Sequence, residues 1–158
     1  MMNIEIERKF LVTDDRFKTL SSHKKYIKQG FLNSDKHRVV RVRIIDDTAF
    51  ITVKGVSNAS GTSRFEWEKE ISVEDAEQLM LLCEPGIIEK YRHYHRLNDH
   101  TFEIDEFLGD NLGLIVAEVE LQKELEVFEA PSYLGKEVTG DQQYYNSNLS
   151  KHPFKLWA

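Results

Sequence analysis

The sequence Glu5-Ile6-Glu7-Arg8-Lys9 is predicted to open the first β-strand, and it decides the fold. Because successive side chains of a strand point to opposite faces, Glu5, Glu7 and Lys9 share one face. The two carboxylates lie roughly 7 Å apart along the strand, and they repel each other unless a cation lies between them. Mg²⁺ prefers oxygen ligands and binds through one or two carboxylates together with substrate phosphates, which Lys9 can also attract. Taken alone, this strand indicates a solvated face with one salt bridge.

The same alternation of charge recurs along the chain. Further strands are predicted over residues 26–32, 39–45, 48–54, 64–71, 87–97, 101–107 and 114–121. One face of these strands carries the charged residues Arg41, Arg43, Lys54, Arg64, Glu66, Glu68, Lys90, Arg92, Glu103, Asp105, Glu118 and Glu120. Short connections such as Asp46-Asp47 favour antiparallel pairing. Since eight strands can close around a small ligand, the sequence predicts an α+β fold built on a closed eight-stranded antiparallel β-barrel, apolar outside and charged within.

Helices are predicted to cover the apolar outer surface of this barrel. Their expected positions are residues 13–20, 72–83, 123–129 and 141–150. Thr13, Ser72 and Asp141 are the expected N-cap residues, because their side chains can accept hydrogen bonds from the first helical N–H groups. The helical spacing of the apolar residues between Val73 and Cys83 predicts a stripe that faces the core.

Length and composition restrict the function. The 158 residues are the size of one domain, and the predicted domain spans residues 1–158. A net charge of −6 argues against a dedicated nucleic-acid binder, and no apolar run approaches the length of a membrane span. The single cysteine, Cys83, rules out an internal disulfide and fits a reducing compartment. Because no apolar leader follows the N-terminus, a cytoplasmic location is expected.

A lumen that carries both signs of charge suits a polyanion bound together with its metal ion. Guanidinium and ammonium groups bind phosphate oxygens, and carboxylates hold Mg²⁺ or Mn²⁺. Phosphoryl transfer then requires little beyond positioning, charge neutralisation and an oriented water. The alternative is a lattice of compensated ion pairs without a ligand. Burying about fifteen charges for structure alone is costly, however, because buried pairs often fail to recover their desolvation energy.

The charged motifs resemble those of the CYTH domain, the triphosphate tunnel metalloenzyme superfamily. Glu5-x-Glu7-x-Lys9 is similar to the ExExK signature of that family. The similarity continues in order through Arg41-Val42-Arg43, Thr52-Val53-Lys54, Arg64-Phe65-Glu66-Trp67-Glu68, Lys90-Tyr91-Arg92, Glu103-Ile104-Asp105-Glu106-Phe107 and Glu118-Val119-Glu120. The resemblance covers nearly the whole chain. It implies an eight-stranded tunnel, a triphosphate substrate, dependence on Mg²⁺ or Mn²⁺, and closure of one end by the C-terminal helix.

The resemblance also assigns roles to single residues. It implies that Glu5, Glu7, Glu118 and Glu120 hold the metal ion and that Asp105 assists. Apart from the resemblance, Lys9 and Lys90 are the candidates to orient the attacking water, since Phe31 has no hydroxyl that could do so. The candidate phosphate-binding residues are Lys9, Arg41, Arg43, Lys54, Arg64, Lys90 and Arg92, and the additional acidic candidates are Glu66, Glu68 and Glu103.

The motifs indicate the family more specifically than they indicate the substrate. The stretches at residues 7–12, 29–32 and 135–139 resemble small bacterial members that hydrolyse inorganic tripolyphosphate, and this activity is expected. The alternatives are a class IV adenylate cyclase, a thiamine or nucleoside triphosphatase, and a polyphosphate-binding module without turnover. Phe31 keeps the last alternative open, because those relatives often have a tyrosine there whose hydroxyl is implicated in orienting the water.

Two sets of residues are predicted to lie outside the site. His93 and His95 share a face opposite Lys90 and Arg92, so they are expected on the outer surface rather than as metal ligands. The C-terminal Phe154 and Trp157 are interpreted as packing or interface residues, which leaves a homodimer open. No nucleic-acid or membrane partner is expected.

Overall fold

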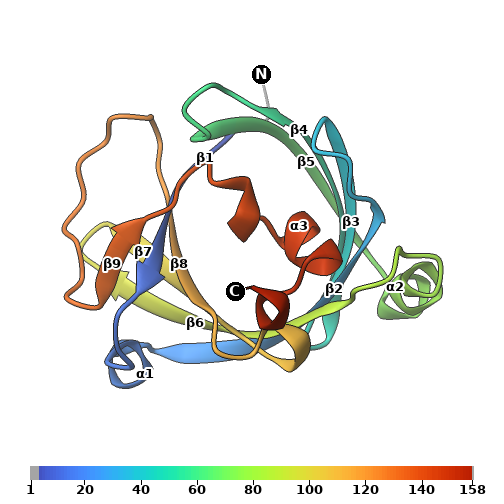
Figure 1. Cartoon of the computed structure of the whole chain (residues 1–158), viewed down its shortest axis with the longest axis horizontal. Coiled ribbons are helices and arrows are strands. Elements are labelled where there is room, and N and C mark those ends of the chain that lie inside the picture. Colours follow the sequence, from blue (N-terminus) through green and yellow to red (C-terminus); the bar gives the residue numbers. More distant parts are fainter. Residues whose placement is uncertain (1–3, 158) are drawn as a thin grey trace.

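The computed structural model describes residues 4–157, and within that range nine strands form one antiparallel sheet. The strands are β1 (Ile4–Val12), β2 (His23–Asn33), β3 (Arg38–Ile45), β4 (Thr48–Ser57), β5 (Ser63–Ile71), β6 (Ile88–Leu97), β7 (His100–Phe107), β8 (Ile115–Glu120) and β9 (Leu134–Glu137). The first eight close into a barrel, because β1 pairs with both β8 and β5 and completes the ring β1-β5-β4-β3-β2-β6-β7-β8. Figure 1 looks through this ring. The predicted barrel and its α+β class are confirmed.

The sequence did not predict β9, because this strand depends on an edge that the barrel leaves free. β5 pairs with β1 only as far as Ile6, and β9 occupies the same edge further along. There Phe10 lies opposite Glu137 and Val12 lies opposite Leu134. The four residues of β9 carry no sustained apolar alternation of their own. The strand is therefore defined by its neighbour rather than by its own pattern.

The predicted helix over residues 123–129 is wrong, because these residues form an irregular loop. Leu125 and Val127 are 92% and 89% exposed, so the segment has no apolar stripe that could hold a helix against the barrel. Instead, the Glu124 carboxylate accepts hydrogen bonds from side chains of the loop at residues 58–62.

The described helices are α1 (Phe17–Leu20), α2 (Val73–Met80), α3 (Asn146–Lys151) and the 3₁₀ turns η1 (Gly109–Asn111), η2 (Gln142–Tyr144) and η3 (Phe154–Leu156). Ser72 caps α2 as predicted, since its hydroxyl accepts a hydrogen bond from the Asp75 N–H at 3.0 Å. Thr13 does not cap α1, because its hydroxyl donates to the Tyr133 carbonyl. No helix within residues 4–157 is long and apolar enough to span a membrane.

The predicted C-terminal helix over residues 141–150 is interrupted. Asp141 caps η2 by accepting a hydrogen bond from the Gln143 N–H at 3.1 Å. Tyr145 then has extended backbone, with φ −68° and ψ 135°, and separates η2 from α3. As a result the C-terminal segment enters the end of the barrel as two short pieces joined by an extended residue (Figure 1).

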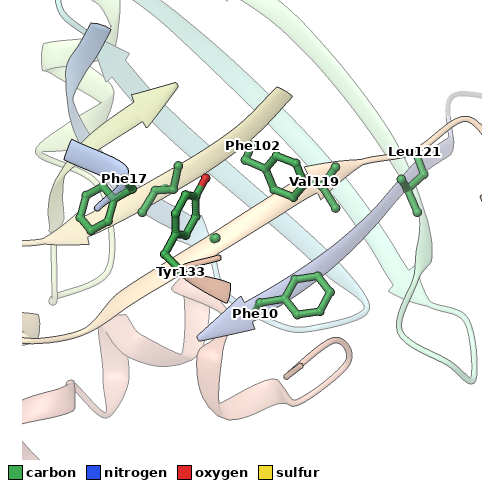
Figure 2. Packing of buried hydrophobic residues seen from close by; sticks show 8 residues of the cluster. Phe10, Phe17, Phe102, Val119, Leu121 and Tyr133 are labelled. Atoms are coloured by element: carbon green, nitrogen blue, oxygen red, sulfur yellow. The ribbon is translucent and has the colours of Figure 1, made fainter. Parts of the chain in front are cut away.

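Two apolar clusters lie on the outer surface of the barrel. One joins outward side chains of β1, β7 and β8 to α1 and to the segment before β9. Within it Tyr133 packs edge-on against Phe17, with ring centroids 6.1 Å apart (Figure 2). The other lies beneath α2, where Ala76 covers Val42 and Ala49. The apolar outer face predicted from the alternation is thus covered by helices on these two sides.

A third apolar cluster lies inside the barrel, at the end that α3 occupies. We call it the apolar floor; it consists of Phe31, Val39, Ile88, Phe107, Leu114, Val116 and Leu149. Leu149 of α3 is fully buried, and Phe154 and Trp157 pack against the same cluster, as predicted. The lumen is therefore charged along most of its length and apolar where the C-terminal segment closes it.

The contact between Gly86 and α3 gives the first prediction. Gly86 has a φ of +96°, a Cβ there would overlap the Ser150 carbonyl, and the Ser150 hydroxyl donates to the Gly86 carbonyl. Gly109 also has a positive φ, +59°, but a Cβ there would meet nothing within 4 Å. Both alanine variants incur the left-handed backbone cost of about 1–2 kcal/mol, but only Gly86→Ala also displaces α3.

We therefore expect Gly86→Ala to lower the thermal unfolding midpoint more than Gly109→Ala, by about 2–4 °C for each further kcal/mol lost. Differential scanning calorimetry measures both midpoints, and limited trypsin cleavage after Lys151 reports whether α3 is displaced. Equal midpoints and equal cleavage would show that α3 adjusts without strain.

Candidate functional site

The barrel contains a cavity of about 240 Å³, and 14 of the 24 residues that line it are charged. Of the predicted site residues, all except Asp105 line this cavity: Glu5, Glu7, Lys9, Arg41, Arg43, Lys54, Arg64, Glu66, Glu68, Lys90, Arg92, Glu103, Glu118 and Glu120. The alternation found in the sequence explains this, because residues two apart on a strand share a face and the closed sheet has only one interior.

The ring order separates the two signs of charge. β8 and β1 are neighbours in the ring and supply Glu5, Glu7, Glu118 and Glu120. β3 and β6 flank β2 on the opposite side and supply Arg41, Arg43, Lys90 and Arg92. One wall of the cavity is thus mainly acidic, and the wall facing it is mainly basic.

Several ion pairs compensate part of this charge. The Lys54 ammonium lies 2.9 Å from Glu5 and 3.3 Å from Glu66. The Lys9 ammonium lies 3.6 Å from Glu118. Burial alone would raise the pKa of Glu118, but the charge of Lys9, a hydrogen bond with Glu7 and the charges of Arg92 and Lys90 together hold that pKa far below its usual range. Glu5 and Glu118 are therefore ionised in the folded protein, whereas burial and the charge of Glu5 raise the pKa of Glu66.

Asp105 anchors the two basic residues of β6 from behind the cavity wall. Its carboxylate accepts hydrogen bonds from the Lys90 ammonium at 2.8 Å and from the Arg92 guanidinium at 2.7 and 2.9 Å. Burial would raise the pKa of Asp105, but Arg92 and Lys90 together lower it. Asp105 is 2% exposed, so the structure places it among cations rather than with the acidic residues that face the cavity.

Glu7 and Glu120 have no such compensation. They lie directly opposite each other on β1 and β8, and neither has a cationic partner within 4 Å in residues 4–157. Burial, followed by the charges of Glu118 and Glu5, raises the pKa of Glu7 well above its usual value. Burial and Glu5 also raise the pKa of Glu120. Like charges at opposed positions destabilise a sheet, so this oxygen-only donor set fits a hard divalent cation.

The acidic wall is nevertheless not a preformed ligand cluster. In the described part of the chain, no three Asp, Glu, His or Cys side chains are grouped so that they could hold a metal ion. Glu5 and Glu118 are paired with Lys54 and Lys9 instead. A bound cation would therefore compete with these two lysines for the carboxylates.

On the basic wall, some hydrogen-bond donors lack acceptors in the described part of the chain. The Nε atoms of Arg41 and Arg43 are buried and find no hydrogen-bond partner within residues 4–157. Burial and the neighbouring Arg41 and Arg92 lower the pKa of Arg43 to about 9. Burial also lowers the pKa of Lys90, to about 7. Buried donors are nearly always satisfied in native proteins, so these groups indicate a site for an anion.

The C-terminal segment contributes residues that the sequence did not identify: Thr139, Gly140, Tyr145, Asn146 and Ser147 line the same cavity. The Tyr145 ring lies 5.2 Å from the Lys9 ammonium and 5.7 Å from the Arg64 guanidinium, at cation–π distance. No periodic signal marks these residues, because they belong to a turn, an extended residue and the first residues of the short α3, and their positions depend on tertiary packing.

The two histidines lie outside the cavity, as predicted. His93 interacts with Glu106 at 3.0 Å and packs edge-on against Phe17. His95 hydrogen-bonds the Tyr133 hydroxyl at 2.7 Å. Both therefore pack with the aromatic side chains on the outer surface of the barrel.

Comparison with known proteins identifies a matching family and several similar proteins. A family model described as the CYTH domain matches residues 3–153. A protein of Acetivibrio thermocellus named inorganic triphosphatase is 47% identical over 155 residues, covering 98% of this chain and 97% of that protein. A Nitrosomonas europaea protein of the same name is 35% identical over 150 residues, covering 92% and 96%. A solved structure described as an inorganic triphosphatase is 31% identical, with a TM-score of 0.65 and coverage of 98% and 95%.

Removal of the Glu7 charge should stabilise the metal-free protein. In Glu7→Gln an amide of the same shape removes the repulsion from Glu118, Glu5 and Glu120. We expect a thermal midpoint about 2–4 °C higher in EDTA, which corresponds to about 1 kcal/mol in a chain of this size. Because the folded-state pKa of Glu7 is raised, this advantage should disappear as the pH falls below about 4, where the carboxylate is protonated in both states.

Glu77→Gln, the same substitution on the exposed face of α2, is the matched control and should leave the midpoint unchanged. Titration with Mg²⁺ should raise the midpoint of the wild-type protein and raise that of Glu7→Gln much less. A lower midpoint for Glu7→Gln in EDTA would instead indicate that Glu7 is a partner in a structural ion-pair lattice.

Proposed function

The chain belongs to the CYTH domain family, and from this we propose that it hydrolyses a triphosphate, inorganic tripolyphosphate, inside its barrel. Water adds to a terminal phosphorus, the bridging P–O bond breaks, and orthophosphate and pyrophosphate leave. The names of the relatives support this reaction, since both curated proteins are called inorganic triphosphatase.

The observation that carries the proposal is that one cavity contains both arginine donors and carboxylates whose charges are not compensated by a partner in residues 4–157. Within residues 4–157, the buried Nε donors of Arg41 and Arg43 on β3 have no hydrogen-bond partner, and Glu7 of β1 and Glu120 of β8 have no cationic partner within 4 Å. A lattice built for stability alone would pair these groups with each other. A triphosphate bound together with a divalent cation would satisfy both sets at once.

In this proposal the basic wall binds the substrate. The guanidinium groups of Arg41, Arg43, Arg64 and Arg92 and the Lys54 ammonium hold phosphate oxygens, the arginines in bidentate fashion. Lys9 and Lys90 orient the attacking water against the terminal phosphate. Positioning and charge neutralisation account for most of the catalysis of such reactions, and Asp105 contributes by fixing Lys90 and Arg92.

The acidic wall is proposed to hold the metal ion, Mg²⁺ or Mn²⁺. Glu5, Glu7, Glu118 and Glu120 are the assigned ligands, and Glu66, Glu68 and Glu103 are additional candidates. Such an ion, when bound, neutralises phosphate charge and draws electron density from the phosphoryl group. Asp105 was also predicted as an assisting ligand; because it lies behind the wall, that role stays a prediction.

The dimensions of the cavity favour a small polyanion over a nucleotide. Its volume of about 240 Å³ lies below the range of about 300–1,000 Å³ that is typical of sites for drug-sized ligands. A nucleoside or thiamine group attached to the triphosphate would require further space. The cyclase and thiamine triphosphatase alternatives are therefore less well supported than tripolyphosphate hydrolysis.

We further propose that residues 1–158 form one domain, since strands from both ends of the described chain belong to the same sheet. The single cysteine supports a reducing, cytoplasmic location. The predicted homodimer and the absence of nucleic-acid partners stay predictions.

Phosphate release from tripolyphosphate, with Mg²⁺ or Mn²⁺ and with EDTA, tests the proposed function. We expect release that requires the metal ion and that exceeds release from ATP or thiamine triphosphate at equal concentration. Release from ATP that exceeds release from tripolyphosphate, or cyclic AMP among the ATP products, would overturn the substrate assignment. Tight calorimetric binding of tripolyphosphate without any hydrolysis would favour the binding module.

Arg43→Ala should weaken substrate binding more than it slows the chemical step. A hydrogen bond to a charged group contributes about 1.5–3 kcal/mol, so we expect KM for tripolyphosphate to rise roughly 10-fold or more. The turnover number should change less, because the guanidinium binds ground state and transition state alike. Arg38→Ala, on the exposed end of β3, is the control. An unchanged KM in Arg43→Ala would remove Arg43 from the substrate site.

A further inference from the structure

The Lys90 ammonium is held between two acceptors that come from different parts of the fold. Its side chain is buried, and Nζ donates to Asp105 Oδ2 of β7 at 2.8 Å and to Asn146 Oδ1 of α3 at 2.8 Å. The Asp105 contact is an ion pair within the barrel wall. The Asn146 contact joins Lys90 to the C-terminal segment, which closes the end of the barrel.

The chemistry of the three side chains fixes which atom of Asn146 faces Lys90. An ammonium group only donates hydrogen bonds, so Asn146 must present its oxygen. The Gln29 side-chain nitrogen donates to the same oxygen at 2.9 Å. The Asn146 oxygen therefore accepts two hydrogen bonds, which occupy both of its lone pairs and fix the orientation of the amide.

Gln29 is difficult to explain by stability. Its side chain is fully buried, and its Oε1 atom finds no partner within residues 4–157. A buried unpaired oxygen costs about 1–3 kcal/mol, and an apolar side chain of similar size would avoid that cost. The glutamine is explained if its nitrogen is needed to hold the Asn146 amide toward Lys90.

The backbone of Asn146 is held in place independently of these contacts. Asn146 is the first residue of α3, and three residues later Leu149 is fully buried in the apolar floor. The next residue, Ser150, donates its hydroxyl proton to the Gly86 carbonyl. Asn146 therefore offers Lys90 a fixed acceptor rather than one that follows the lysine.

We propose that Asn146 is a positioning residue, which together with Gln29 holds the Lys90 ammonium at the place where it orients the attacking water. This inference rests on the proposed function. Asp105 alone does not fix the ammonium, because its Oδ2 also accepts a hydrogen bond from Arg92 and the lysine side chain is flexible. The acceptor on α3 restrains Nζ from a second direction, and it makes the C-terminal segment part of the reactive geometry.

Steady-state hydrolysis of tripolyphosphate by Asn146→Ala tests the proposal. A small misplacement of a group near the reaction can cost up to about 100-fold in rate, and we expect kcat to fall roughly 10- to 100-fold with KM changed much less. Asn146→Asp keeps an oxygen acceptor and should retain a higher kcat than Asn146→Ala. The matched control is Asn148→Ala, an exposed asparagine of the same helix, which should leave both constants unchanged.

A double-mutant cycle separates positioning from a purely structural role. If Asn146 acts through Lys90, adding Asn146→Ala to Lys90→Ala should lower kcat no further than Lys90→Ala alone. A second readout does not need turnover: the ammonium protons of Lys90, identified by the signal that Lys90→Ala lacks, should exchange with water faster in Asn146→Ala. Thermal midpoints of all variants show whether the fold is kept.

The possible failures can be told apart. A wild-type protein that hydrolyses tripolyphosphate, with an Asn146→Ala variant of unchanged kcat and unchanged ammonium exchange, would overturn the role of Asn146 alone. Equal losses from Asn146→Ala in the presence and absence of Lys90 would also overturn it. A wild-type protein that does not hydrolyse tripolyphosphate would overturn the proposed function itself, whatever the lysine signal shows.

Discussion

Closure of the sheet gathers the charged faces of seven strands into one lumen and shields many of these charges from bulk water, and the rest of the structure depends on how they are compensated. The effective cost of burying an ion is several kcal/mol, and only close, hydrogen-bonded partners recover it. Asp105 meets this condition, because Lys90 and Arg92 donate three hydrogen bonds to it. The acidic residues Glu7 and Glu120 do not, since the register of β1 and β8 sets them against each other. The register therefore decides which charges are structural and which remain available to a ligand.

The apolar floor strengthens the electrostatic interactions between these charges. α3 and the residues after it seal one end of the lumen with Leu149 and aromatic side chains, so that end of the barrel is dry. Charges interact more strongly where water is excluded and the effective dielectric constant is low. The same exclusion of water lowers the pKa of Lys90 to about 7. The C-terminal segment thus affects the electrostatics of the cavity as well as its shape, although it carries few charges itself.

The sequence predicted the barrel and its wall because both follow from a period of two residues. That period fixes which face a residue occupies, and it placed every predicted site residue except Asp105 on the cavity. It cannot give the partner of a residue, which depends on register between strands far apart in the chain. For that reason the pattern could not distinguish Asp105, which is bound to two cations, from Glu7, which has no cationic partner within 4 Å in residues 4–157. β9, the loop at residues 123–129 and the lumen-facing Tyr145 and Asn146 escaped prediction because they have no period; neighbouring elements determine their conformation.

The structure also bears on whether the lumen is merely a lattice of ion pairs. Seven basic and seven acidic residues line the cavity, so the charges that the barrel itself supplies are close to balanced overall. Yet the ring order places four of the seven acidic residues on β8 and β1 and four of the seven basic residues on β3 and β6, across the cavity from each other. A lattice selected for stability would interleave the two signs so that every group finds a partner. Overall balance combined with local separation is the arrangement expected of a site that accepts an anion on one wall and a cation on the other, because the pair enters without changing the net charge that the fold must enclose.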